Sequence, residues 1–338
     1  MSESKIAVKV EGGVGKHIAF TATLPKLKEK YDEIILISAY PEVFIGNDNV
    51  WRNLGFNHPY LYEDYLKEVR VISSEAYLTD DYRFKKSHLI EAYSAILDVK
   101  YTKNMLPEVF IQDNEEEAFK EQFLKGTIQD KEYIVVQIAG GTSYYTPQMV
   151  GQKLIKSRDY PKELAKQFCL DFMKKYPNIV IVQVGLPTEY KLNSEPELAQ
   201  VLYMTNLTSR AFFPVIEHCK TFVVIDSFLS HISAAFKKKG IVLWGGTNPK
   251  NLGYEHNVNV SDSNLCTNLF CNRPNTFLFD HVTGALWQCN KKYSCMRIPP
   301  ATIMAEITKL IGAPKKDTPD PIEDAIKGKK DGRTNSDK

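Results

Sequence analysis

The stretch "TFVVIDSFLSHISAAFKKKGIVLWGGTNPKN", residues 221–251, contains the pattern of a strand, a helix and a second strand in succession. Its first apolar run ends at Asp226, and either Asp226 or Ser227 can cap the helix that follows. The lysines at 237–239 fall in the expected last turn, where cations suit the helix dipole, and Gly240 is a suitable stop. The stretch therefore predicts a β-α-β unit.

The start of this helix carries polar side chains. Ligands of parallel α/β sheets bind at the carboxyl ends of strands, against helix amino termini that favour anions. Ser227, Ser230 and His231 are spaced i, i+3 and i+4, so they share one face of the first turn. This face suits a diphosphate, although a capped helix with an exposed polar side has the same pattern. The positions expected to face the core are Phe228, Leu229, Ile232 and Phe236.

Strand and helix patterns alternate along most of the chain, and they restart after an acidic stretch at residues 112–132. This alternation in two halves predicts an α/β protein with two doubly wound domains, 1–127 and 128–312, that face a cleft. Strands are expected at residues 5–10, 33–38, 68–73, 133–141, 178–185, 221–226 and 240–246, and helices at 16–31, 87–98, 161–177 and 227–240.

The C-terminal part holds one further helix and a polar tail. Residues 299–312 are expected to form a helix that packs near the domain junction. Residues 313–338 are rich in proline, lysine and aspartate, and this composition predicts a disordered tail.

The composition is that of an ordinary globular protein. The chain has 338 residues, 43% of them hydrophobic and 25% charged, and a net charge of +2 is too small to indicate a nucleic-acid binder. The sequence lacks a run of 18 apolar residues and begins without the pattern of a secretory signal, so we expect a cytoplasmic protein without a transmembrane segment. The pattern does not indicate an oligomeric state.

A glycine-rich turn, "VEGGVGKHIAF" at residues 10–20, follows the first expected strand. A P-loop needs a glycine five residues before the glycine that precedes its lysine, and a serine or threonine after that lysine. Here Val10 stands five residues before Gly15, and His17 follows Lys16. The turn is therefore not a P-loop, and another role must explain it.

Several motifs together resemble one family. "DSFLSH" at 226–231, followed by "SAA" at 233–235, and "LWGGTNP" at 243–249 are similar to the signature of the heptosyltransferase-like glycosyltransferases. The glycine turn followed by "TATL" at 21–24 fits the family's beginning. Other segments follow in the family's order, and the resemblance covers most of residues 6–311: "NHPYL" at 57–61, "SRDYP" at 157–161, "QVGLPTE" at 183–189 and "CMRI" at 295–298.

The resemblance implies the GT-B fold, with two Rossmann-like domains, and transfer of a sugar from a nucleoside diphosphate sugar to a hydroxyl group. His231 would contact the donor; it could donate one hydrogen bond when neutral and also offset charge when protonated. The turn of Gly12, Gly13 and Gly15 would form the acceptor-side loop. The implied donor-binding residues are Arg158, Glu189, Asp226, Ser227, Ser230, His231, Gly245, Gly246 and Thr247.

Two positions depart from the family pattern. Phe228 stands where the family usually has glycine, and Lys16 corresponds to the acid that usually serves as the catalytic base. Attack by an acceptor hydroxyl needs a base, so we rank Glu11 first and His17 second, with Asp48 also after a strand end. Alternatively Lys16 orients an acidic acceptor, or the chain binds a sugar nucleotide without catalysis.

The acceptor stays open between a glycolipid core sugar and nucleic acid. A lipopolysaccharide-type acceptor is usual for the family, and a hydroxylated or hydroxymethylated DNA base, as in phage-type DNA modification, would also suit the architecture. The segments "FKKSH" at 84–88 and "YTKN" at 101–104, with Tyr82, Phe84 and Tyr101, could contact a polyanion or be ordinary surface.

Four of the six cysteines are clustered. Structural zinc sites usually separate paired cysteines by two to four residues, whereas four residues lie between Cys266 and Cys271 and five between Cys289 and Cys295. We therefore expect no metal in catalysis and keep a structural zinc site at these four cysteines as the alternative. Cys169 and Cys219 are expected to be buried.

Overall fold

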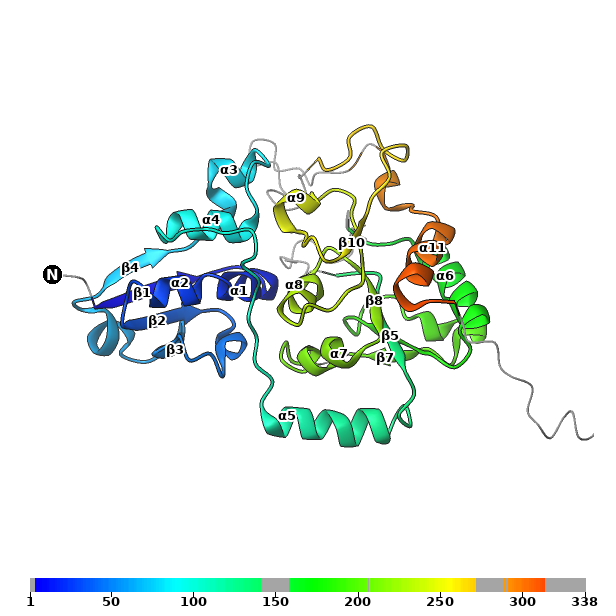
Figure 1. The fold of residues 1–338 in the computed structure, drawn as a ribbon, viewed down its shortest axis with the longest axis horizontal. Helices are drawn as coiled ribbons and strands as arrows, with labels where there is room; N and C mark the ends of the chain where they lie inside the picture. Colours follow the sequence, from blue (N-terminus) through cyan, green and yellow to red (C-terminus); the bar gives the residue numbers. More distant parts are fainter. Residues whose placement is uncertain (1–3, 141–157, 206, 272–288, 290, 314–338) are drawn as a thin grey trace, which may run out of the picture.

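The computed structural model describes residues 4–140, 158–205, 207–271, 289 and 291–313. They form an α/β fold with two parallel sheets in two lobes, the first at the N-terminal side and the second in the green and yellow part of the chain (Figure 1). The predicted fold class is confirmed. Within the described ranges, no helix has the length and apolar character needed to cross a membrane.

The first sheet has the strand order β3-β2-β1-β4. The chain adds β2 and β3 on one side of β1 and then returns to add β4 on the other side, so the strand order reverses between β1 and β4. Such a switch point leaves a crevice at the carboxyl ends of the two strands. The strands are β1 Lys5–Val10, β2 Glu33–Ser38, β3 Arg52–Gly55 and β4 Arg70–Ser73, and the α-helices are α1 Val14–Thr21, α2 Leu24–Lys28, α3 Asp80–Arg83 and α4 Leu89–Ile96.

The helix expected at 16–31 is broken into α1 and α2. Thr21 and Thr23 turn their hydroxyls back to the carbonyls of Ile18 and Phe20, and Pro25 lies in the first turn of the new helix. Proline lacks the N–H that a continuous helix would need at this position. Pro25 therefore separates the two helices.

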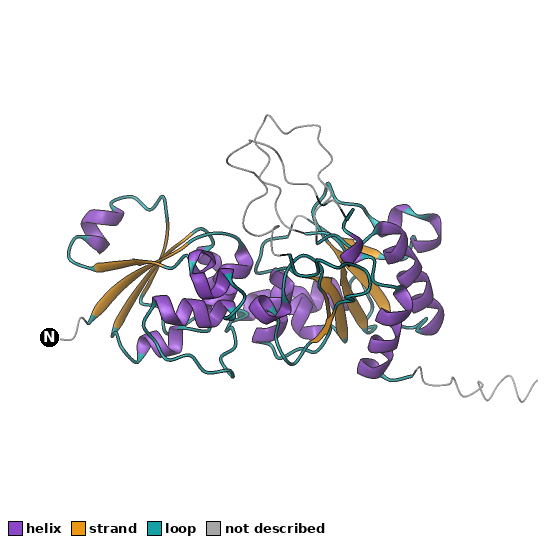
Figure 2. Ribbon diagram, turned by 90° about the horizontal axis from the view of Figure 1, so that it is seen from above, coloured by secondary structure: helices purple, strands orange, loops and turns teal. Residues whose placement is uncertain are grey.

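The second sheet has the order β10-β9-β8-β5-β6-β7, with its switch point between β5 and β8. Helices lie on both sides of its strands (Figure 2). The strands are β5 Tyr133–Gln137, β6 Val180–Val184, β7 Leu202–Met204, β8 Thr221–Ile225, β9 Ile241–Leu243 and β10 Val258–Val260, and the α-helices are α6 Lys162–Lys175, α7 Phe212–His218, α8 Phe228–Ala235, α9 Pro249–Leu252 and α11 Pro300–Ile311.

The β-α-β unit of residues 221–251 is confirmed, but its helix is shorter than expected. Ser227 is the cap, and its hydroxyl accepts the N–H of Leu229 at 3.2 Å. The helix ends at Ala235 because Lys237 adopts a left-handed backbone, with a φ of 51°. The stop expected at Gly240 was wrong, and the lysines follow the helix instead of lying in its last turn.

Helix α5 (Asp113–Ala118) and the π-helix η4 (Phe119–Lys125) lead from the first sheet to the second. This segment packs against the second sheet's own elements, since Phe119 stacks on His218 of α7 with ring centroids 5.5 Å apart. The boundary placed at residue 127 lies between η4 and β5, and the exact division into domains stays a prediction.

Arg210, which precedes α7 in the second lobe, forms hydrogen bonds to this linker and to the first lobe. It is buried, and its guanidinium donates to both carboxylate oxygens of Glu115 at 2.5 and 2.6 Å. It also donates to the carbonyls of Glu42 at 2.9 Å and Phe110 at 2.8 Å. One planar cation therefore bonds to the first lobe and to the linker.

The C-terminal helix forms as expected, but not at the expected place. Helix α11 packs on α6, at the end of the molecule away from the first sheet (Figure 1). Lys175 donates to the hydroxyl of Thr308 at 2.7 Å, and the hydroxyl of Tyr176 donates to the carbonyl of Gly312 at 2.8 Å. The packing expected near the domain junction was wrong, and the tail from residue 314 lies outside the described residues.

Candidate active site

The two switch points face each other across a cavity of about 760 Å³. Its lining combines the glycine turn and the ends of β2 and β4 with the ends of β5, β6 and β8. The chemically distinctive residues from the first lobe are Gly12, Gly13, Gly15, Lys16, Glu42, Glu75 and Tyr77, and those from the second are Gln137, Arg158, Glu189, Asp226, Ser227, Phe228 and His231.

Two helix amino termini meet at this cavity. A Cβ on Gly15 of α1 would lie 3.0 Å from Cδ2 of His231 and 3.4 Å from the Cα of Phe228, both on α8. Glycine at this position therefore lets the two helices approach closely. Each helix has eight residues, and each directs the positive end of its dipole toward the cavity.

The glycine turn also makes room for the Lys16 side chain. Gly12 has a φ of +92°, which side-chain-bearing residues rarely adopt, and a Cβ there would lie 2.5 Å from Cδ of Lys16. Both properties require glycine. The turn therefore positions a lysine and a helix terminus, which explains a glycine-rich sequence that lacks the P-loop pattern.

Lys16 is paired with a carboxylate from the neighbouring strand. Its ammonium lies 2.5 and 2.6 Å from the two carboxylate oxygens of Glu75, which follows β4, and 4.1 Å from the centre of the Tyr77 ring. The Lys16 side chain is 8% exposed and that of Glu75 25% exposed. The sequence motifs did not identify Glu75, because it is 59 residues from Lys16 in the sequence. The sequence feature that could have identified it is its position directly after a strand at the switch point.

The second lobe contributes a cation and a capped helix. Arg158 donates to the Asp226 carbonyl at 3.1 Å, and its guanidinium lies 3.6 Å from the Asp226 carboxylate. The hydroxyl of Ser227 donates to the side-chain oxygen of Gln137, at the end of β5. The structure therefore brings Arg158, Asp226 and Ser227 together at the switch point of the second sheet.

His231 lines the cavity as a neutral imidazole. Burial lowers its pKa to about 4, and its Nδ1 lies 2.7 Å from the hydroxyl of Tyr254. Burial raises the pKa of Tyr254 well above its ordinary value, so that hydroxyl keeps its proton. When Tyr254 donates to Nδ1, the N–H of His231 is on Nε2, the side of the ring near Gly15.

The two ranked base candidates lie elsewhere. Glu11 is outside the described lining of the cavity, and its carboxylate pairs with Lys9 at 2.9 Å. His17 is fully buried, with its ring nitrogens 3.1 and 3.0 Å from the carbonyls of Gly13 and Val10, and burial lowers its pKa. Asp48 is also outside the described lining. The structure therefore does not bring these three residues to the cavity.

Some expected donor contacts belong to the framework behind the site. The hydroxyl of Ser230 donates to the Ser227 carbonyl at 2.8 Å, and a Cβ on Gly245 would lie 2.5 Å from the sulfur of Met296. Gly245, Gly246, Thr247 and Ser230 are buried and stand outside the described lining.

Phe228 and Glu189 reach the cavity. Phe228 packs against the core as expected, edge-on to the buried Phe212 with ring centroids 5.3 Å apart, and it also lines the cavity. The carboxylate of Glu189 accepts the N–H of Leu186 at 3.0 Å, which holds it at the end of β6.

The clustered cysteines lie around Cys295. All six cysteines are free thiols, and Cys169 and Cys219 are buried as expected. Burial, and then the neighbouring Cys266, Cys271 and Cys289, raise the pKa of Cys295 to about 11. A structural zinc site at these four cysteines stays the alternative to the expected absence of a metal.

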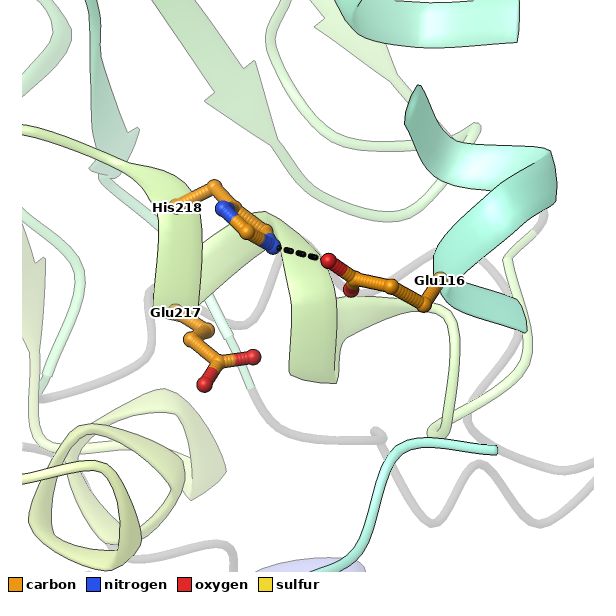
Figure 3. A group of neighbouring side chains, drawn as sticks. All are labelled: Glu116, Glu217 and His218. Carbon is orange, nitrogen blue, oxygen red and sulfur yellow. Dashed lines mark hydrogen bonds and ion pairs between the residues drawn. The ribbon is translucent and has the colours of Figure 1, made fainter. Parts of the chain in front are cut away.

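A separate group with metal-ligand chemistry lies between α5 and α7 (Figure 3). One ligand atom each from Glu116, Glu217 and His218 lies within 4.8 Å of the others. Glu116 already bonds to His218 and to the ammonium of Lys120, both at 2.8 Å. These contacts attach the linker to the second lobe, outside the described lining of the cavity.

Residues 188–275 match the model of glycosyltransferase family 9 (heptosyltransferase). This segment of the chain is similar to the heptosyltransferase family. The matched segment contains Glu189 and the β-α-β unit with Ser227 and His231, which line the cavity, and the buried Gly245 loop behind it. No curated protein sequence matches the chain.

Solved structures share the fold over most of the chain. A family 9 glycosyl transferase from Veillonella parvula is 14% identical, with a TM-score of 0.66, covering 92% of this chain and 98% of that one. ADP-heptose LPS heptosyltransferase II from E. coli is 13% identical, with a TM-score of 0.62, covering 91% of this chain and 98% of that one. The iron-containing dodecameric glycosyltransferase TibC from enterotoxigenic E. coli is 13% identical, with a TM-score of 0.61, covering 91% of this chain and 76% of that one. These likenesses establish the two-domain GT-B fold.

Proposed function

We propose that this heptosyltransferase-like chain is a glycosyltransferase that moves a sugar from a nucleoside diphosphate sugar to a hydroxyl acceptor. The observation that carries the proposal is the cavity in which the switch points of two sheets and the amino termini of α1 and α8 converge. A cavity of about 760 Å³ is large enough for a sugar nucleotide.

The diphosphate would lie against the amino terminus of α8. Main-chain N–H groups and the positive end of the dipole favour an anion there. Arg158 adds a cation close to Asp226, and the Nε2–H of His231 adds a neutral hydrogen-bond donor. The ribose would lie near Glu189, at the end of β6.

The reaction that we propose is a direct displacement. The acceptor oxygen attacks the anomeric carbon while the bond from that carbon to the diphosphate breaks, so the configuration inverts. The leaving diphosphate gains negative charge, which the α8 terminus, Arg158 and His231 are placed to stabilise. The protein must also accept the proton of the attacking hydroxyl.

We propose a glycolipid-type acceptor, because the similar E. coli protein is by its name an LPS heptosyltransferase. The structure gives little support to the contact with nucleic acid that Tyr82, Phe84 and the neighbouring lysines suggested. Tyr82 is fully buried and stacked on Tyr77, and the ammonium of Lys85 donates to the carbonyl of Phe270.

We propose that the transfer needs no metal. The cavity supplies its own cation, Arg158, and the amino terminus of α8 for a ligand with two phosphates. A structural metal at the four clustered cysteines stays a separate proposal, and TibC is by its name iron-containing. Metal analysis of the purified protein would test it, and treatment with a chelator should leave transfer unchanged. Cytoplasmic localisation also stays a prediction.

A thermal-shift screen of ADP-, GDP- and UDP-sugars tests the proposed function, with ADP-heptose as the first donor because of the similar E. coli protein. We expect one nucleotide class to raise the Tm and to be released as the free diphosphate in the presence of acceptor. Arg158→Met should weaken that binding, and Arg52→Met, an exposed arginine outside the described cavity lining, is the matched control. Binding without release would favour a non-catalytic sugar-nucleotide-binding protein.

A further inference from the structure

We propose that Glu75 is the catalytic base and that Lys16 is the residue that positions it; this inference rests on the proposed glycosyl transfer. Lys16 occupies the position where the similar family has its acid, and its ammonium is in contact with the carboxylate of Glu75. The carboxylate at this switch point therefore lies on the loop that follows β4, next to the β1–α1 turn that carries the lysine.

The position of Glu75 satisfies the first requirement of a base, which is access to the acceptor. Its side chain lines the cavity, and a quarter of it is exposed there. Its Oε1 accepts the N–H of Tyr77 at 3.1 Å, which fixes the carboxylate by its own loop as well as by Lys16. A carboxylate has about four lone-pair directions, so Oε2 keeps one for a hydroxyl proton.

The same loop faces the donor side of the cavity. Burial raises the pKa of Tyr77, and the next largest influences are the charges of Asp226 and Arg158 in the second lobe. Tyr77 is two residues from Glu75 and bonded to it. An acceptor hydroxyl between Glu75 and the α8 terminus would therefore have a base on one side and the anomeric carbon on the other.

Glu42 is the other first-lobe carboxylate in the described lining, and its hydrogen-bond partners lie in the second lobe. Its carboxylate accepts the hydroxyl of Ser209 at 2.7 Å, and its carbonyl accepts from Arg210. These bonds connect it to the second lobe beside the linker. Glu42 is therefore part of the contact between the lobes, whereas Glu75 is held within the first lobe and open to the cavity.

The acceptor oxygen forms a bond to the anomeric carbon, and the bond from that carbon to the diphosphate oxygen breaks with its electron pair. The proton of the hydroxyl moves to Oε2 of Glu75 and later to solvent. Lys16 orients the carboxylate before attack through its contacts with both carboxylate oxygens.

The experiment uses ADP-heptose as donor, follows ADP release and measures the affinity for ADP separately. Glu75→Gln should reduce kcat about a hundredfold or more, the usual contribution of a base, while the Kd of ADP stays within about threefold. Glu75→Asp should restore part of the activity. Glu33→Gln is the matched control, because Glu33 pairs with Lys5 at 2.7 Å at the opposite end of the same sheet.

Lys16→Met should lower kcat while the Kd of ADP stays within about threefold, because Glu75 loses the ammonium that orients its carboxylate. Lys16→Arg, which keeps a cation at this place, should restore part of the kcat. A purely structural lysine would change the Tm and leave the kcat of the folded protein unchanged.

The outcomes separate the two proposals. Full turnover by a folded Glu75→Gln variant of an active protein would overturn the role of Glu75 and leave glycosyl transfer intact. Loss of turnover in Glu11→Gln instead would assign the base to Glu11. A wild-type chain that neither binds ADP nor releases it from ADP-heptose would overturn the inference together with the donor class.

Discussion

At the scale of single residues, the imidazole of His231 lies where the two lobes touch. It is bonded to Tyr254 on one side and lies close to Gly15 on the other. Its pKa of about 4 means that the ring is neutral at pH 7. It can therefore donate a hydrogen bond to a phosphate, but it carries no positive charge that would offset the negative charge of the phosphate. This selects the first of the two roles that the sequence left open.

His231→Ala should therefore reduce kcat by about tenfold to a thousandfold, the range expected for one donor to a developing negative charge. The Tm and the turnover should be measured on the same preparation. Tyr254→Phe should have a smaller effect, because it removes the hydroxyl that fixes the tautomer and keeps the imidazole at the cavity. Unchanged turnover in a stable His231→Ala protein would remove this residue from the site.

At the scale of secondary-structure elements, the approach of α1 to α8 determines the shape of the cavity. Gly15 has no room for a Cβ without movement of the His231 ring, whereas a Cβ on Gly13 would have no neighbour within 4 Å among the described atoms. Gly13 also has an extended backbone, with a φ of −80°, that any residue adopts. A side chain should therefore be tolerated at Gly13 but not at Gly15, which makes the two positions a matched pair.

Gly15→Val should push the helix termini apart, and we expect a tenfold or larger fall in kcat/KM, because a displacement of about 1 Å costs that much or more. Gly13→Ala should stay within about threefold of wild type. Transfer rates and the Kd of ADP, measured for both variants, test this. Equal rates for the two variants would show that the close contact is not needed for turnover.

At the scale of the whole molecule, buried histidines connect the lobes and make their stability depend on pH. His88 caps α4 in the first lobe, and its ring lies 5.3 Å from that of Tyr254, which bonds to His231. Burial lowers the pKa of His88 and of His231 to about 4, from 6.5. The unfolded chain therefore binds more protons than the folded one between these values.

The stability contributed by the neutral histidines is complete above about pH 6.5 and is lost as the pH falls toward about 4, by at most about 1.4 kcal/mol per pH unit for each histidine. His88→Asn, which can still cap the helix, should flatten the decline of Tm between about pH 6.5 and 5. His58, at the surface of the first lobe, is the control. The pKa of Glu115 and that of Glu116 are also lowered in the folded protein. The stability that these ionised carboxylates contribute is therefore lost only at a pH below the range in which the histidines act. An equally steep decline in His88→Asn would contradict the prediction.

The sequence by itself determined most of the longer elements and the part of the cavity wall at the start of α8. Apolar runs such as 221–225 and 133–137 could be identified as strands because a parallel strand buried on both faces is apolar throughout. Ser227 and His231 follow directly from one such strand, so their positions were readable from local spacing. The short strands β3, β7 and β10 were missed because three or four residues do not establish a period.

Only the tertiary structure decided which residues face the cavity. Glu11 and His17 are neighbours of Lys16 in sequence, but the turn directs one to Lys9 and buries the other. Glu75 meets Lys16 because β4 pairs with β1 in parallel, which brings two loops 59 residues apart to one sheet edge. Long-range pairing of strands depends on the packing of the whole sheet, and local sequence patterns do not contain that information.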